Sequence, residues 1–122
     1  MRHSLNKPDA NQAEIDEALR GLGCVVISMR GDPGIGFDSL VAVAGHLFAV
    51  EVKDGSKSPS KRRLTNAEQA RKDDLNRAGA PYIVFESVDD AVNFVKWVRR
   101  ENMKIRITSA RAVPFRFVAD DD

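Results

Sequence analysis

The segment from Phe37 to Lys53, FDSLVAVAGHLFAVEVK, constrains the fold most, because it contains two apolar runs joined by Gly45-His46. Both runs are rich in Val, Leu, Phe and Ala. A Gly-X pair between two such runs predicts a β-hairpin with a two-residue loop of type II′. A loop of this length fixes the register, and by counting outward from it Asp38 is expected opposite Lys53.

The charged residues of this segment are predicted to share one face of the hairpin. Side chains alternate between the two faces of a strand, which places Asp38, Glu51 and Lys53 together at one end. The opposite face is apolar and predicts the main core: it carries Val41, Val43, Phe48, Val50 and Val52. Charges next to a hydrophobic sheet are costly to bury unless they are paired or bind a metal. The hairpin therefore predicts a charged site at its open end.

Two carboxylates and an amine in this arrangement suit a divalent cation. Neighbouring carboxylates repel, and a hard cation that prefers oxygen ligands offsets the repulsion. Mg²⁺ retains several waters and uses one or two protein carboxylates, which leaves room for a phosphate oxygen. The amine of Lys53 could orient or deprotonate an attacking water, or neutralise charge that develops on the phosphate. This is the chemistry of phosphodiester hydrolysis.

Asp38 followed by Glu51-Val52-Lys53 resembles the PD-(D/E)xK nuclease signature. The details are most similar to the small VRR-NUC and Holliday-junction-resolvase-like nucleases of phage or prophage type, and the resemblance runs from about residue 11 to 95. It implies an α/β, restriction-endonuclease-like fold, with an αβββαβ core in which helices flank a mixed central sheet.

The resemblance also implies roles for these residues. Asp38 and Glu51 match the metal ligands, with the backbone carbonyl of Val52 as a further ligand. Lys53 matches the residue that orients or activates water. Mg²⁺ is the implied cofactor, with Mn²⁺ as a substitute, and no organic cofactor is implied.

Two further residues match the family pattern, and one position departs from it. A glutamate on the first helix, often a metal or water ligand, matches Glu14, and a glutamine on the helix after the motif matches Gln69. From the residues alone, Glu14 is equally well explained as the glutamate of a capping box that opens at Asn11, and Gln69 by a surface position. The family usually has proline before the aspartate, where this chain has Phe37.

The remaining patterns predict one domain, residues 1–122, with its core over about 11–100. The expected elements are a helix from Asn11 to about Gly21–Gly23, a buried strand over Cys24–Met29, a helix from the Thr65 capping box to about Ala78, a strand over Tyr82–Phe85 and a helix from Val88 to about Arg100. Two alternating runs within residues 103–118 predict a C-terminal β appendage. Its apolar edge would favour a homodimer.

The composition limits where nucleic acid can bind. Nineteen basic and eighteen acidic residues give a net charge of +1, so the chain has no global basic field. The loop after Lys53 carries Lys57, Lys61, Arg62 and Arg63, which are expected to contact DNA phosphates. A solvated surface loop is the alternative interpretation of this charge run.

Several other classes of protein are disfavoured. No stretch has the length of a membrane span, and a single cysteine with two histidines excludes zinc-finger sites by count. Cys24 lies in an apolar run and is expected to be a buried, reduced thiol, consistent with a cytoplasmic location.

The sequence thus favours a Mg²⁺-dependent endonuclease that hydrolyses DNA, with branched or junction DNA as a candidate substrate. A non-catalytic nucleic-acid-binding or assembly module with the same fold is the alternative. A third interpretation is a purely structural cluster in which Glu51 and Lys53 form ion pairs around Asp38.

Overall fold

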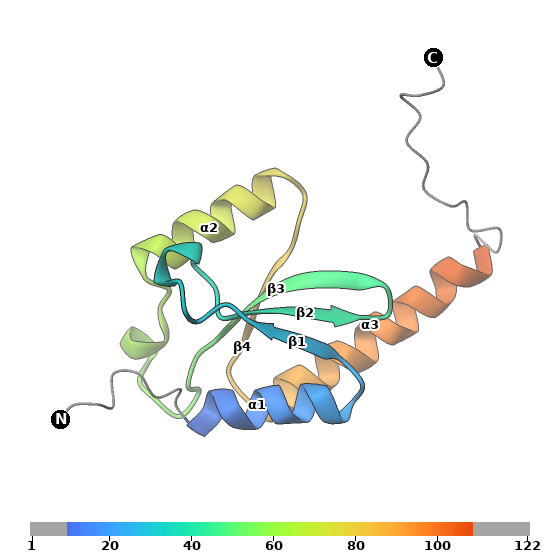
Figure 1. Cartoon of the computed structure of the whole chain (residues 1–122), viewed down its shortest axis with the longest axis horizontal. Helices are drawn as coiled ribbons and strands as arrows, with labels where there is room; N and C mark the ends of the chain where they lie inside the picture. Colours follow the sequence, from blue (N-terminus) through green and yellow to red (C-terminus); the bar gives the residue numbers. More distant parts are fainter. Residues whose placement is uncertain (1–9, 109–122) are drawn as a thin grey trace, which may run out of the picture.

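The computed structural model describes the backbone of residues 10–108 and the side chains of residues 11–102. Its elements, shown in Figure 1, are α1 (Ala10–Gly21), β1 (Val25–Ser28), η2 (Pro33–Ile35), β2 (Ser39–Val43), β3 (His46–Val52), η3 (Pro59–Arg62), α2 (Asn66–Arg77), β4 (Tyr82–Phe85) and α3 (Val88–Thr108). The predicted αβββαβ order is confirmed, and α3 completes it.

The four strands form one mixed sheet in the order β1-β2-β3-β4. β2 is antiparallel to both β1 and β3, whereas β4 runs parallel to β3. A parallel pair of strands needs a crossover connection, and α2 lies in the connection between β3 and β4. In Figure 1, α3 passes behind the sheet and α1 lies along its lower side.

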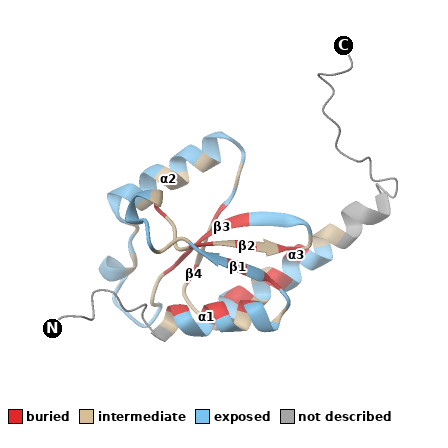
Figure 2. Ribbon diagram, viewed as in Figure 1, coloured by how far each residue is buried: buried red, intermediate tan, exposed pale blue. Residues whose placement is uncertain are grey.

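The core lies between the sheet and the helices α1 and α3. The five residues predicted to face it are all buried: Val41, Val43, Phe48, Val50 and Val52. They pack in one cluster with residues of the two helices, among them Ile15, Leu19, Ala91, Val95 and Val98. Figure 2 shows these buried positions on α1, α3 and the strands. The predicted distribution of side chains between the two faces of the hairpin is therefore confirmed.

The predicted loop of the hairpin is wrong. The turn is centred on Ala44 and Gly45, whereas the prediction centred it on Gly45 and His46. Both central residues have positive φ, 54° for Ala44 and 83° for Gly45, which is the geometry of a type I′ turn and not of type II′. A two-residue turn of either type satisfies the sequence pattern, so the pattern did not decide which pair occupies it.

The register of the hairpin changes with the turn. Ser39, the first residue of β2, pairs with Val50, whereas the predicted register would pair it with Val52. Asp38 precedes β2 and donates its N–H to the carbonyl of Val50, so it does not lie opposite Lys53 as predicted. The shift is two residues along β3, and a shift of two keeps every side chain on its predicted face. The consequence is chemical: the side chain of Asp38 interacts directly with that of Glu51.

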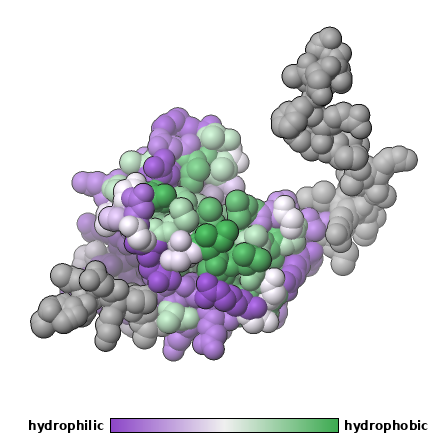
Figure 3. Space-filling view, viewed as in Figure 1, coloured by the Kyte–Doolittle hydropathy of each residue, from purple (hydrophilic) through white to green (hydrophobic). Residues whose placement is uncertain are grey.

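The strand predicted to be buried over residues 24–29 is an edge strand. Cys24 and Val26 face the core, but Val25 and Ile27 are 58% and 47% exposed on the other face. Leu47 of the neighbouring hairpin is also 58% exposed on that face, and Figure 3 shows apolar side chains gathered there. A continuous apolar run is compatible with burial on both faces, but the exposure of Val25, Ile27 and Leu47 shows that only one face of this strand is buried.

The predicted β appendage is wrong over its first run. α3 continues to Thr108, so residues 103–107 are helical. The prediction failed because an alternating run of five residues is too short to distinguish a strand from a continuing helix. The second run, residues 113–117, lies outside the described residues, and the homodimer stays a prediction. None of the helices within residues 10–108 has the length and hydropathy needed to cross a membrane.

Candidate active site

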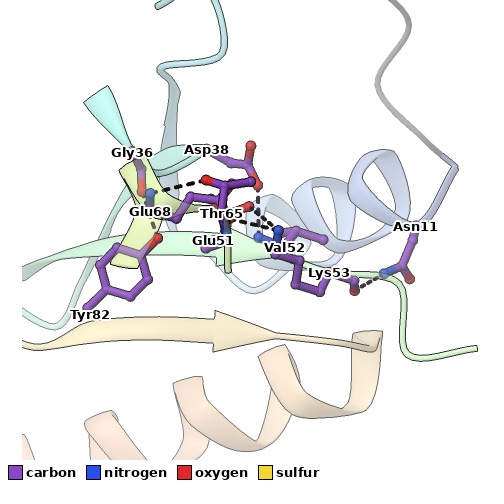
Figure 4. Close-up of polar contacts among 9 residues, drawn as sticks. All are labelled: Asn11, Gly36, Asp38, Glu51, Val52, Lys53, Thr65, Glu68 and Tyr82. Atoms are coloured by element: carbon purple, nitrogen blue, oxygen red, sulfur yellow. Dashed lines mark hydrogen bonds and ion pairs between the residues drawn. The ribbon is translucent and has the colours of Figure 1, made fainter. Parts of the chain in front are cut away.

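The open end of the hairpin brings Asp38 and Glu51 together (Figure 4). The backbone N–H of Asp38 donates to the carbonyl of Val50 at 2.9 Å, and its Oδ2 accepts from the N–H of Val52 at 2.8 Å. These bonds fix the Asp38 carboxylate beside β3. The carbonyl of Val52 as a further metal ligand stays a prediction.

The loop that leads into Asp38 is held by β4 and α2. Gly36 has a φ of +87°, and a Cβ at this position would lie 2.7 Å from Cβ of Arg71, so only glycine fits without a shift. The Tyr82 hydroxyl donates to the Gly36 carbonyl at 2.6 Å, and Arg71 Nε donates to the Ile35 carbonyl at 2.7 Å. These contacts position the loop with Phe37 where the family usually has proline.

Lys53 lies between two carboxylates. Its Nζ is 2.8 Å from Oε1 of Glu68 and 3.5 Å from Oε2 of Glu51, and its side chain is 13% exposed. Burial alone lowers the pKa of Lys53, but the hydrogen bond and charge of Glu68, followed by those of Glu51, outweigh burial and raise it. Lys53 is therefore an ammonium, which favours orienting water or stabilising charge over deprotonating water.

Glu51 is the most constrained acid of the site. It is only 3% exposed, and among the described residues its buried Oε1 has no hydrogen-bond partner. Burial, the charge of Asp38 and a hydrogen bond with Glu68 raise the pKa of Glu51 to about 9. Burial also raises the pKa of Asp38, although the N–H of Val52 partly offsets this. A divalent cation would reverse both shifts by stabilising the charged forms.

Glu68 belongs to the site, and the sequence interpretation missed it. The predicted capping box at the start of α2 is confirmed: Thr65 Oγ1 accepts from the N–H of Glu68 at 3.2 Å, and Glu68 Oε1 accepts from the N–H of Thr65 at 2.8 Å. The same Oε1 also accepts from Lys53 Nζ. Burial raises the pKa of Glu68, but the bonds from Lys53 and Thr65 outweigh it and lower the pKa. The capping box explained Glu68 fully as a helix cap, so its second role left no signal.

The structure does not bring Gln69 or Glu14 into the site. Gln69 is exposed on α2, where its Nε2 donates to Asp73 Oδ1 at 3.0 Å. Glu14 is exposed on α1, and the buried acid of that helix is Asp16, two residues further on.

The capping box predicted at Asn11 is also wrong, because α1 already includes Ala10. The side chain of Asn11 instead donates from Nδ2 to the carbonyl of Lys53 at 2.7 Å. This bond ties the start of α1 to the end of β3, so the polar residue that suggested a helix cap serves to position the site.

The basic loop lies outside the cavity of the site. Arg62 forms an ion pair with Glu86 at 3.1 Å and donates from Nε to the carbonyl of Lys57. Lys57, Lys61 and Arg63 are exposed, and their contact with DNA stays a prediction.

A cavity of about 260 Å³, which we name the acid pocket, opens in front of the two carboxylates. It is lined by Met29, Arg30, Asp32, Pro33, Gly36, Phe37, Asp38, Glu51, Thr65 and Glu68. Within the described part of the chain, no three His, Cys, Asp or Glu side chains are arranged to hold a metal together. Mg²⁺ does not need three, because it binds through one or two carboxylates and keeps its waters. Asp38 and Glu51 fit that requirement, because they supply two carboxylates and Oε1 of Glu51 has no hydrogen-bond partner among the described residues.

The mixed sheet, the helix in its crossover and the acid pair at the hairpin end define a PD-(D/E)xK nuclease-like fold. A comparison with solved structures finds a VRR-NUC domain that is 25% identical to this chain, with a TM-score of 0.51, and the match covers 70% of this chain and 89% of that one. No family model and no curated protein matches the chain. The predicted resemblance to the VRR-NUC domain is thus confirmed for the fold.

Proposed function

We propose that the chain is a Mg²⁺-dependent endonuclease that hydrolyses DNA phosphodiester bonds. One observation carries the proposal: Asp38 and Glu51 line the same open pocket, and Glu51 presents a buried oxygen that no described residue satisfies. The similarity to a VRR-NUC domain supports the same reaction class. Branched DNA is the proposed substrate class within it.

Each residue has a defined part in this reaction. Asp38, Glu51 and the carbonyl of Val52 would hold Mg²⁺, which supplies positive charge to the phosphate and an acidified water when it is bound. Mn²⁺ is the proposed substitute. The ammonium of Lys53, held by Glu68 and 3.5 Å from Glu51, would stabilise negative charge on the phosphate or orient the water.

A structural ion-pair cluster explains the site less well. Lys53 does pair with Glu68 and Glu51, as that interpretation requires. One ammonium, however, cannot balance Asp38, Glu51 and Glu68 when all three are ionised, and without a metal the excess is relieved by protonation of Glu51, whose pKa is about 9. Buried charges without compensation are costly, so the excess of acid favours a site that binds a cation.

Metal binding tests the proposal independently of cleavage. We expect calorimetric titration with Mn²⁺ at pH 8 to show one site in the wild type, with release of a proton because Glu51 must ionise. Asp38→Asn should weaken the affinity by about tenfold or more. Asp73→Asn, which removes an exposed acid of α2, is the matched control and should bind as the wild type does. Equal binding by the wild type and Asp38→Asn would favour the ion-pair cluster.

A further inference from the structure

Arg30 lies in the loop after β1, between α1 and the acid pocket. Its Nη2 is 2.7 Å from Oδ2 of Asp16, and the two side chains are 30% and 8% exposed. Arg30 lines the acid pocket and also a second cavity of about 410 Å³ beside α1. Arg30 therefore lies at the boundary of the two cavities.

The acid pocket is lined by more acidic than basic residues, and Arg30 is positioned to offset part of this excess. Asp32, Asp38, Glu51 and Glu68 line it, and among its lining residues Arg30 is the only arginine or lysine. A DNA phosphate that enters this pocket meets strong negative charge. A metal on the acid pair offsets part of that charge, and the remainder needs a second cation at the pocket wall.

The hydrogen bonds of Arg30 are incomplete. A guanidinium has five donors and no acceptor, and within residues 11–102 the buried Nε of Arg30 has no partner. Asp16 occupies Nη2 through one oxygen. An unused donor next to an ion-paired one matches a group with several anionic oxygens, and arginine binds phosphate oxygens in this forked manner.

We propose that Arg30 binds the substrate phosphate in the acid pocket and that Asp16 holds the guanidinium in place until DNA enters. The inference rests on the proposed function, because it names a phosphate ligand for that reaction. Burial raises the pKa of both Asp16 and Asp38, and the positive charge of Arg30 counteracts the rise in both, which agrees with a guanidinium located between the two acids. Asp16 is thus a positioning residue that competes with the phosphate for Arg30.

This competition predicts opposite effects for the two partners. We expect Arg30→Gln to weaken binding of a labelled linear duplex and a labelled four-way junction by about tenfold, and Asp16→Asn to strengthen it. Binding is measured by fluorescence anisotropy in Ca²⁺ over a series of salt concentrations. Loss of one phosphate contact should also reduce the salt slope by about 0.9. In the double variant, the gain from Asp16→Asn should disappear.

Two neighbours provide matched controls. Arg20→Gln and Glu17→Gln remove the same charges from residues that line only the second cavity, so they should change binding much less. Thermal unfolding verifies that each variant is folded. If Arg30→Gln binds as Arg20→Gln does, or if Asp16→Asn weakens binding as much as Arg30→Gln, then the pair is a structural brace and the inference is wrong.

The same samples separate this inference from the proposed function. If the wild type cleaves DNA and Arg30→Gln binds and cleaves DNA equally well, only the proposed role of Arg30 is wrong. A wild type that neither binds nor cleaves either DNA contradicts the proposed function, and the role of Arg30 falls with it.

Discussion

Lys53→Ala is expected to lower the single-turnover rate of DNA cleavage in Mg²⁺ by about 10²–10³-fold. Lys53 is the cation closest to the acid pair, and it is held 2.8 Å from Glu68 and 3.5 Å from Glu51. Its loss removes charge that stabilises the phosphorane-like transition state, while both proposed metal-ligand carboxylates remain. The rate is measured with enzyme in excess over labelled DNA, so that product release does not limit it.

The matched control is Lys96→Ala, because Lys96 is an exposed lysine of α3 that lies outside both the acid pocket and the basic loop. It should change the cleavage rate far less than Lys53→Ala does. Mn²⁺ titration of Lys53→Ala should still show one site, which separates lost chemistry from a lost metal. An unchanged cleavage rate in a folded Lys53→Ala variant would remove Lys53 from the mechanism.

Glu51→Gln is expected to abolish most of the decrease in stability of the metal-free protein at high pH. The pKa of Glu51 is about 9 in the folded protein, against 4.5 for an ordinary glutamate. Between these values the folded state binds a proton that the unfolded state lacks, so the free energy of unfolding falls as pH rises. The slope from this one group is at most about 1.4 kcal/mol per pH unit. Glutamine has no such proton, so the variant becomes the more stable protein as pH rises.

Chemical denaturation at several pH values between 5 and 9 measures this difference, with the exposed Glu14→Gln as control. Glu14→Gln should follow the wild type at every pH. Saturating Mg²⁺ should restore stability to the wild type at pH 8, because the ion binds the folded, ionised site, and should help Glu51→Gln much less. Parallel stability curves for Glu51→Gln and the wild type would show that Glu51 is ionised in the folded protein without a metal.

The hairpin segment predicted the faces of the sheet but not its register. Alternation has a period of two, so the apolar positions from Val41 to Val52 identified the core face in either register. The choice between a turn at Ala44-Gly45 and one at Gly45-His46 depends on positive φ at an alanine. Alanine rarely adopts that conformation, so local propensity favoured the wrong pair and tertiary packing decided the outcome.

The residues that support the acid pair were harder to predict. The capping box fully explained Glu68, and Asp16 belongs to no sequence motif, so the sequence predicted a site role for neither residue. Glu68 contacts Lys53 from α2, and Asp16 of α1 contacts Arg30 of the pocket wall. Both contacts depend on how the two helices pack against the rest of the chain. That packing is set by long-range contacts, such as Asn11 on the carbonyl of Lys53, which no local pattern contains.

Cleavage by the wild type, run beside Asp38→Ala, tests the central claim most directly. The panel contains labelled linear duplex, single strand, flap and four-way junction, each with Mg²⁺, with Mn²⁺ and with EDTA. We predict cutting of at least one DNA in either metal, none in EDTA, and loss of cutting in Asp38→Ala. Cutting that survives in EDTA or in a folded Asp38→Ala variant would contradict a metal-dependent site at Asp38 and Glu51. Tight binding without cutting would instead support the non-catalytic nucleic-acid-binding module.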